Sequence, residues 1–200
     1  MASRRGKTLL RRIFRRIAIR VIRGYRTVSH AAASVLAELP PIELYAQMYA
    51  EVYRRTKELD GLGVVLIPRV RAAVRLQARR RMLERWIEDL SNPRNNSGRR
   101  VVKAIRPRLI KWVERADGEM SYRVAQVFTS HGCFGSYLCR IGREMDARYH
   151  HCGRGEDTAQ HTLEDYPAWA NERRALVQQL RSDDLSLSSV ITTMLEGEES

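Results

Sequence analysis

The sequence predicts an all-α protein, built as an irregular array of helices. Apolar residues recur at spacings of three and four along most of the chain, which is the period of an amphipathic helix. Capping residues and prolines stand at the starts of many of these stretches. The chain has 200 residues, of which 44% are hydrophobic, and this is enough to bury a core. We expect no sheet larger than a short hairpin.

The first helix is expected between Leu10 and Tyr25, where an apolar stripe runs along one face and arginines lie opposite. The stripe consists of Leu10, Ile13, Phe14, Ile17, Ala18, Val21 and Tyr25. Two interpretations stay open. The helix can pack on the core with a solvated basic face, or its basic face can contact phosphates.

Turn formers and caps place the remaining helices. Ser29 is a suitable N-cap, Pro107 must break or kink its helix, and Ser182 or Asp183 caps the last one. Residues 61–67 are expected as a short apolar strand or loop. The predicted helices cover approximately 29–39, 41–59, 68–90, 99–115, 121–130, 135–141, 167–180 and 182–196. Trp86, Trp112, Trp169 and Cys133 are expected to pack as apolar groups.

The stretch SNPRNNSG is the clearest loop in the chain, because it contains only turn formers and one arginine. It divides the chain into a basic helical region at 1–90, a linker at 91–98, a helical region at 99–148 and a C-terminal region at 149–200.

Charge is unevenly distributed. The chain has 36 Lys and Arg against 23 Asp and Glu, a net charge of +13. Residues 1–120 carry 28 basic and 11 acidic side chains, whereas residues 121–200 carry 8 and 12. A polyanionic partner therefore meets the N-terminal part. The residues expected to contact RNA or DNA phosphates are Arg11, Arg12, Arg15, Arg16, Arg20, Arg23, Arg26, Arg75, Arg79, Arg80 and Arg81.

Several classes of protein are disfavoured. No apolar run reaches the roughly 18 residues of a membrane span, and three cysteines do not suggest a disulfide-stapled secreted fold. We expect an intracellular protein, nuclear or cytoplasmic. An arginine-rich start without acids also leaves a mitochondrial transit peptide open. The oligomeric state is not predicted.

The sequence offers no catalytic centre. Two-metal nucleotidyl transfer needs clustered carboxylates, and the adjacent pair Asp183 and Asp184 fits a helix start instead. We therefore expect no enzyme activity from this chain on its own.

Residues 149–166, YHHCGRGEDTAQHTLEDY, contain the spacing of a zinc knuckle. Cys152 and His161 are natural zinc ligands, and partners at positions 149 and 166 would complete a set of four. Tyr149 and Tyr166 stand at those positions. A phenol, with an ordinary pKa of ~10, is a poor substitute for a thiolate. The expectation is a degenerate subdomain without zinc, held by Leu163, Tyr166 and Trp169, unless His150 or His151 completes the site.

Three stretches together resemble a known family: AIRVIRGYRTVSHAAASVLAELPPIEL at 18–44, QVFTSHGCFGSYLCRIGRE at 126–144 and CGRGEDTAQHTLEDYPAW at 152–169. They resemble the C-terminal end of the reverse transcriptase polyprotein of non-LTR (LINE-type) retrotransposons, particularly those of arthropods. The resemblance implies that residues 1–90 follow the polymerase palm and thumb. It also implies that the family's Cys-Cys-His-Cys knuckle has decayed here, since a single base change turns a cysteine codon into a tyrosine codon.

Two functions are expected from these observations. The first is a C-terminal fragment of a retrotransposon reverse transcriptase that lacks the catalytic carboxylates and binds nucleic acid through basic helices. The alternative is a domesticated, non-enzymatic interaction protein, whose basic helices bind a protein partner or an acidic membrane surface.

Overall fold

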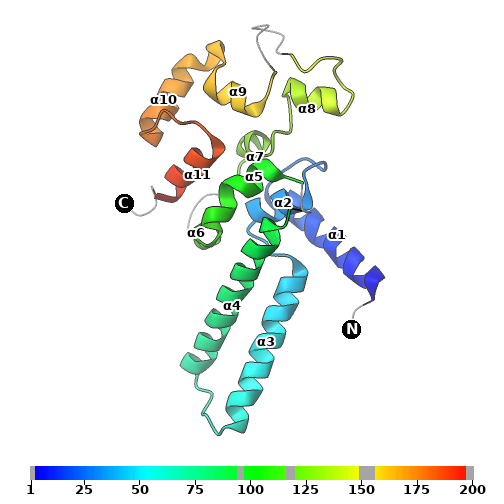
Figure 1. Ribbon diagram of the computed structural model, residues 1–200, viewed down its shortest axis with the longest axis vertical. Coiled ribbons are helices and arrows are strands. Elements are labelled where there is room, and N and C mark those ends of the chain that lie inside the picture. The colour runs from blue at the N-terminus through cyan, green and yellow to red at the C-terminus, as the bar shows by residue number, and fades with distance from the viewer. Residues whose placement is uncertain (1–2, 94–96, 116–119, 149–155, 197–200) are drawn as a thin grey trace.

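The computed structural model describes residues 3–93, 97–115, 120–148 and 156–196, and within these ranges it is helical (Figure 1). The ranges contain no β-strand, and Arg148 and Glu156 form an isolated bridge. The predicted all-α class is therefore confirmed. The helices are α1 (Arg4–Val21), α2 (His30–Leu36), α3 (Ile42–Gly61), α4 (Pro68–Ser91), α5 (Arg99–Ile105), η1 (Arg106–Arg108), α6 (Leu109–Glu114), α7 (Tyr122–Thr129), α8 (Gly135–Arg140), α9 (Ala159–Glu164), η2 (Pro167–Trp169), α10 (Ala170–Leu180) and α11 (Leu187–Glu196).

The short helix α2 lies at the centre of the core. It begins where predicted, because the Ser29 hydroxyl accepts a hydrogen bond from the Ala32 amide at 3.2 Å. Its residues 32–36 are all buried, and it packs against both α1 and α5. The small side chains of its Ala-Ala-Ala-Ser sequence allow neighbouring helices to approach closely.

Two tryptophans complete this core as predicted. Trp86 and Trp112 are fully buried, and the Trp112 indole N–H donates to the Val35 carbonyl of α2 at 2.9 Å. The expectation that Trp169 packs in the core was wrong. Trp169 lies on η2 and is 49% exposed, and its ring is tilted by 58° from the Tyr166 ring, with centroids 6.5 Å apart. Cys133 is likewise exposed rather than packed.

Helices α3 and α4 form a long antiparallel hairpin that projects away from the core (Figure 1). Their connection, residues 62–67, is an irregular loop, which settles the choice between strand and loop. Most of its apolar side chains are exposed at the tip. On the inner side, the buried Glu51 carboxylate pairs with Arg81 and lies 3.6 Å from Arg85.

The C-terminal helices differ from the prediction in two details. The capping hydroxyl of α11 belongs to Ser186, which accepts from the Ser189 amide at 3.3 Å, while Asp184 accepts from the Ser186 amide. The short helix α9, capped by Thr158, was not predicted, because its six residues carry too little periodicity.

Pro107 interrupts its helix as predicted, and the interruption is a 3-10 turn between α5 and α6.

The linker ends at Gly98, where the chain passes close to α2. Gly98 has φ +75°, and a Cβ built there would lie 2.3 Å from the Ser29 hydroxyl and 2.8 Å from the Ala32 Cβ. Two independent reasons therefore favour glycine at this position: the left-handed backbone and the close approach to the cap of α2.

Gly98→Ala should destabilise the protein by about 2–4 kcal/mol, from left-handed strain together with crowding of the Ser29 cap. The matched control is Gly63→Ala, whose φ of +73° is nearly the same but which has no atom within 4 Å of its Cβ. Urea unfolding midpoints would measure the destabilisation of both variants. Equal destabilisation would show that the close approach to α2 contributes nothing.

Candidate nucleic-acid interface

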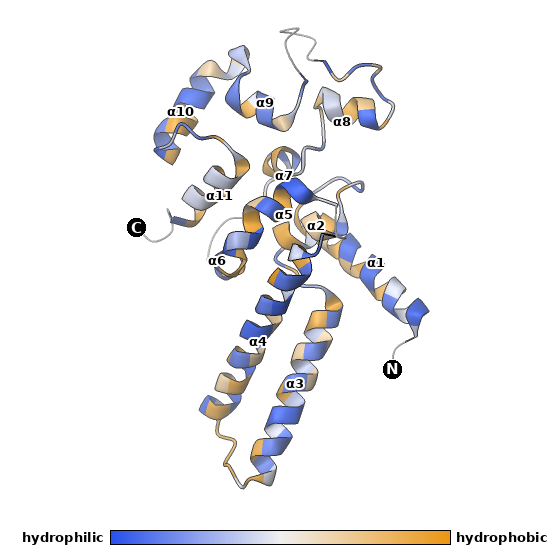
Figure 2. Cartoon of the chain, in the orientation of Figure 1, coloured by the Kyte–Doolittle hydropathy of each residue, from blue (hydrophilic) through white to orange (hydrophobic). Residues whose placement is uncertain are grey.

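Helix α1 does not pack through its predicted apolar stripe. Ala18 and the capping residue Ile22 are buried, but Ile13, Ile17 and Val21 remain 43–53% exposed. The helix contacts the core through an edge that is rotated towards the arginines. Figure 2 shows hydrophilic and hydrophobic residues alternating along α1 out to its free end. The expectation that this stripe forms the core contact was therefore wrong for most of its length.

Two of the predicted phosphate-binding arginines lie on this packing edge. Arg11 forms an ion pair with Glu43 of α3. The Arg15 guanidinium donates to the backbone carbonyls of Arg26 and Val28, the second at 2.8 Å. These contacts hold the segment after α1 against the helix, so neither arginine is fully available to a ligand.

Three arginines of α1 and the later Arg26 line a cleft. Helix α1 ends at Val21, and the backbone of Arg23 turns into the left-handed region with φ 52°. The turn brings the segment after the helix back beside α1. It encloses a cleft of about 530 Å³, lined by Arg15, Arg16, Ile19, Arg20 and Arg26. No carboxylate lines it within the described part of the chain.

The guanidinium groups of five exposed arginines in and after α1 have no hydrogen-bond or ion-pair partner among the described residues. Arg12, Arg16, Arg20, Arg23 and Arg26 are exposed, and their guanidinium groups make no hydrogen bond or ion pair with any residue that the structure describes. Arginines carry five donors in a planar fork that suits phosphate oxygens. We call this set the α1 arginine surface.

The predicted cluster on α4 is divided. Arg75 and Arg79 are exposed and unpaired among the described residues. Arg80 lies 3.7 Å from Glu84 on the same helix, and Arg81 binds the buried Glu51. A cavity of about 380 Å³ between α3 and α4 is lined by two glutamates and four arginines, so the positive charge on this side of the hairpin is partly neutralised.

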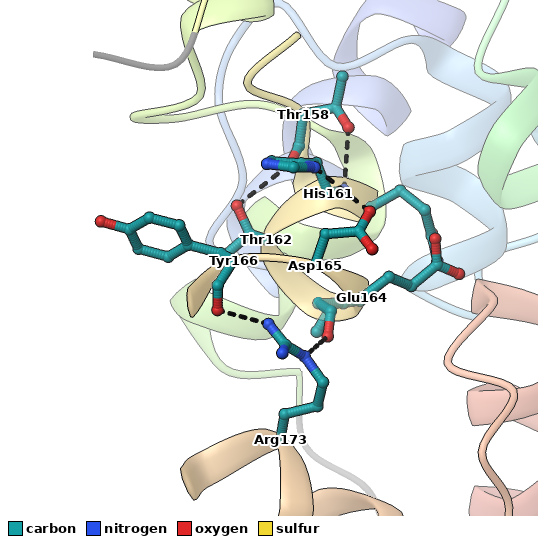
Figure 3. Close-up of polar contacts among 9 residues, drawn as sticks. Thr158, His161, Thr162, Glu164, Asp165, Tyr166 and Arg173 are labelled. Atoms are coloured by element: carbon teal, nitrogen blue, oxygen red, sulfur yellow. Dashed lines mark hydrogen bonds and ion pairs between the residues drawn. The ribbon is translucent and has the colours of Figure 1, made fainter. Parts of the chain in front are cut away.

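The structure places half of the predicted knuckle. Tyr149, His150, His151 and Cys152 lie outside the described residues, so the Cys152–His161 pair is not tested. His161 is in α9, where its Nδ1 lies 3.3 Å from the Asp165 carboxylate (Figure 3).

Arg173 of α10 closes the end of α9, donating to the Leu163 and Tyr166 carbonyls at 2.7 and 2.6 Å (Figure 3). The His161 carbonyl accepts from the Asp165 amide. Three carbonyl groups at the end of α9 and in the turn after it, those of His161, Leu163 and Tyr166, therefore have hydrogen-bond donors. These hydrogen bonds join the end of α9 to α10 in the part of the knuckle stretch that is described.

The described residues include only His161 and Tyr166 of the knuckle's donor set. Tyr166 offers a phenol where a thiolate is needed, and no group of three His, Cys, Asp or Glu residues is close enough to bind a metal among the described residues. Asp183 and Asp184 lie in the turn before α11 and form no carboxylate cluster with another segment there.

Sequence reasoning missed a second basic site. Arg99, Arg100 and Arg140 line one cavity, although 40 residues separate Arg100 from Arg140 in the chain. Nothing in their local sequence distinguishes them from other arginines, because they meet only through the tertiary packing that places α5 beside α7 and the segment that follows it.

No protein family, curated protein or solved structure matches the chain. None of the helices in the described ranges combines the length and hydropathy that a membrane crossing requires.

Replacing both Tyr149 and Tyr166 by cysteine should create a zinc site that the parent chain lacks, because four deprotonated ligands can then close a tetrahedron. The gain should appear as a rise in Tm with added zinc that a chelator reverses.

The control is the same double variant carrying Cys152→Ser, which should not respond to zinc. Stoichiometric zinc in the purified parent that disappears in Cys152→Ala would contradict the prediction and would identify His150 or His151 as a replacement ligand.

Proposed function

We propose that the chain is a nucleic-acid-binding, non-catalytic C-terminal portion of a non-LTR retrotransposon reverse transcriptase. One observation carries the binding function. The cleft beside α1 is lined by four arginines and one isoleucine, and no carboxylate among the described residues lines it. A basic surface that is left unneutralised inside a folded protein is typical of a site for a polyanion.

The spacing of the α1 arginine surface suits an extended phosphate backbone. Arg12, Arg16 and Arg20 recur every four residues, so their Cα atoms lie about 6 Å apart along the helix axis. Such contacts position a nucleic acid without reading its bases. The proposal is therefore binding of RNA or DNA with little sequence preference, and the reverse transcriptase origin rests on the resemblance of the three stretches.

Replacing Arg12, Arg16 and Arg20 by glutamine should weaken binding to an oligonucleotide and flatten its salt dependence. Removing one arginine–phosphate interaction should reduce the slope of log K against log salt by about 0.7–0.9. Removing three should therefore reduce it by about 2–3. Fluorescence anisotropy at several salt concentrations measures both the affinity and the slope.

The control removes three charges elsewhere: Arg143, Arg174 and Arg181, all exposed. Arg173 is not suitable, because it caps α9. An equal reduction of the slope in the control variant would show that only net charge matters and that the α1 arginine surface is not a site.

The exposed stripe of α1 favours a second candidate, an anionic membrane surface. Ile13, Ile17 and Val21 lie beside the free arginines on one helix, and a basic amphipathic helix of this kind can rest in the membrane interface.

Changing Ile13 and Ile17 to serine separates the two candidates, because both residues are exposed and neither belongs to the buried core. Nucleic-acid binding should be unchanged. If α1 acts at a membrane, co-sedimentation with phosphatidylserine vesicles should fall several-fold in this variant. Loss of oligonucleotide binding would instead count against a purely phosphate-directed interface.

A further inference from the structure

A second hollow, of about 500 Å³, shares no lining residue with the cleft beside α1. Its walls come from four segments: residues 27–32 before and in α2, residues 97–101 at the start of α5, residues 129–131 after α7 and residues 137–141 of α8. These segments are brought together by the close approach of Gly98 to α2 and by a hydrogen bond of 2.8 Å between the Thr27 and Tyr137 hydroxyls.

The charged residues that line this hollow have one sign. Arg99, Arg100 and Arg140 line it, and no Asp or Glu of the described chain does so. His131 also lines it, and burial together with the nearby Arg140 charge lowers the pKa of His131, so that the imidazole is neutral at pH 7. The hydroxyl groups of Ser29, Ser97 and Ser130 complete a polar wall.

The burial of the Arg100 guanidinium is energetically unfavourable, because two of its donor atoms have no partner among the described residues. Its Nε and Nη2 atoms are buried and have no hydrogen-bond acceptor. Glu164 acts on it electrostatically, but the two side chains do not form an ion pair. Buried donors of a charged group are strongly unfavourable when they have no acceptor, so this arrangement is better suited to binding an anion than to stability.

We propose that this hollow binds a phosphate group, with Arg100 as the buried donor and Arg99 and Arg140 at its edge. A guanidinium fork matches two phosphate oxygens, and the serine hydroxyls can donate to the others. The neutral His131 and the Tyr137 ring, whose centroids are 4.8 Å apart, form the apolar side of the site. This site includes no residue of the α1 arginine surface and does not require the proposed function.

The test compares the full chain with Arg100→Met, a substitution of similar shape without charge or donors. In chloride buffer the variant should have a higher Tm than the parent, because the unpaired charge is gone. Inorganic phosphate should raise the Tm of the parent by about 3–6 °C at a tenfold excess over its Kd, relative to chloride at equal ionic strength. The variant should show no such rise.

Arg174→Met is the matched control, because this exposed arginine lies on α10 away from the hollow, and it should keep the phosphate response. If Arg100→Met fails to fold, the double variant Arg99→Gln and Arg140→Gln, at exposed positions, should still abolish the response. A phosphate effect no larger than that of chloride, or one retained in Arg100→Met, would overturn the proposal.

Oligonucleotide binding distinguishes the source of the phosphate. If the site takes a backbone phosphodiester, Arg100→Met should weaken oligonucleotide binding about tenfold or more, and the oligonucleotide should suppress the response to free phosphate. If it takes free phosphate, oligonucleotide affinity should be unchanged. The Arg12, Arg16 and Arg20 glutamine variant should keep the phosphate response in both cases, so failure of this site and failure of the proposed function are separate results.

Discussion

Helix α2 has seven residues, too few to persist alone in water, yet five of them are buried. A buried helix must satisfy its terminal backbone groups within the protein. Ser29 does this at the N-terminal end, and the Trp112 indole reaches the Val35 carbonyl from 77 residues further along the chain. This last contact joins the N-terminal helices to α6. The packing of α1, α5 and α6 therefore depends on the burial of α2.

Helix α1 and the α3–α4 hairpin contribute to the core at their inner ends, through residues such as Ala18 and Trp86, and the rest of each projects from it. Helix α1 and the α3–α4 hairpin carry many of the basic residues, and both leave the core with long polar faces (Figures 1 and 2). Their arginines are used in two different ways. Arg15 and Arg81 satisfy internal carbonyl and carboxylate groups, whereas Arg12, Arg16 and Arg20 satisfy nothing among the described residues. Only the second kind can serve a partner without loss of structure.

Local signals in the sequence placed most of the helices. Ser29 acts as the cap it was predicted to be, and Pro68 and Pro107 mark a helix start and a break. The face of α1 that packs on the core could not be predicted. An apolar stripe shows which face of a helix favours burial, but it does not show which other element, if any, packs against that face. The roles of Arg11 and Arg81 depend on carboxylates more than 25 residues away. The cleft beside α1 depends on the left-handed turn at Arg23, a conformation that arginine rarely adopts.

The unpaired arginines lower the stability of the fold, and binding of an anion would offset this loss. The segment from Arg4 to Arg26 contains no acidic residue, so its charges repel one another and are relieved only in part by Glu43. Arg100 adds buried donors without an acceptor in a second place. Selection for stability alone would remove such features, since apolar or uncharged residues at the same positions lower the cost. An anion that binds the folded chain and not the unfolded one relieves both, and its binding energy then adds directly to the free energy of folding. Under both proposals, the same arginines that weaken the isolated fold would make it responsive to phosphate.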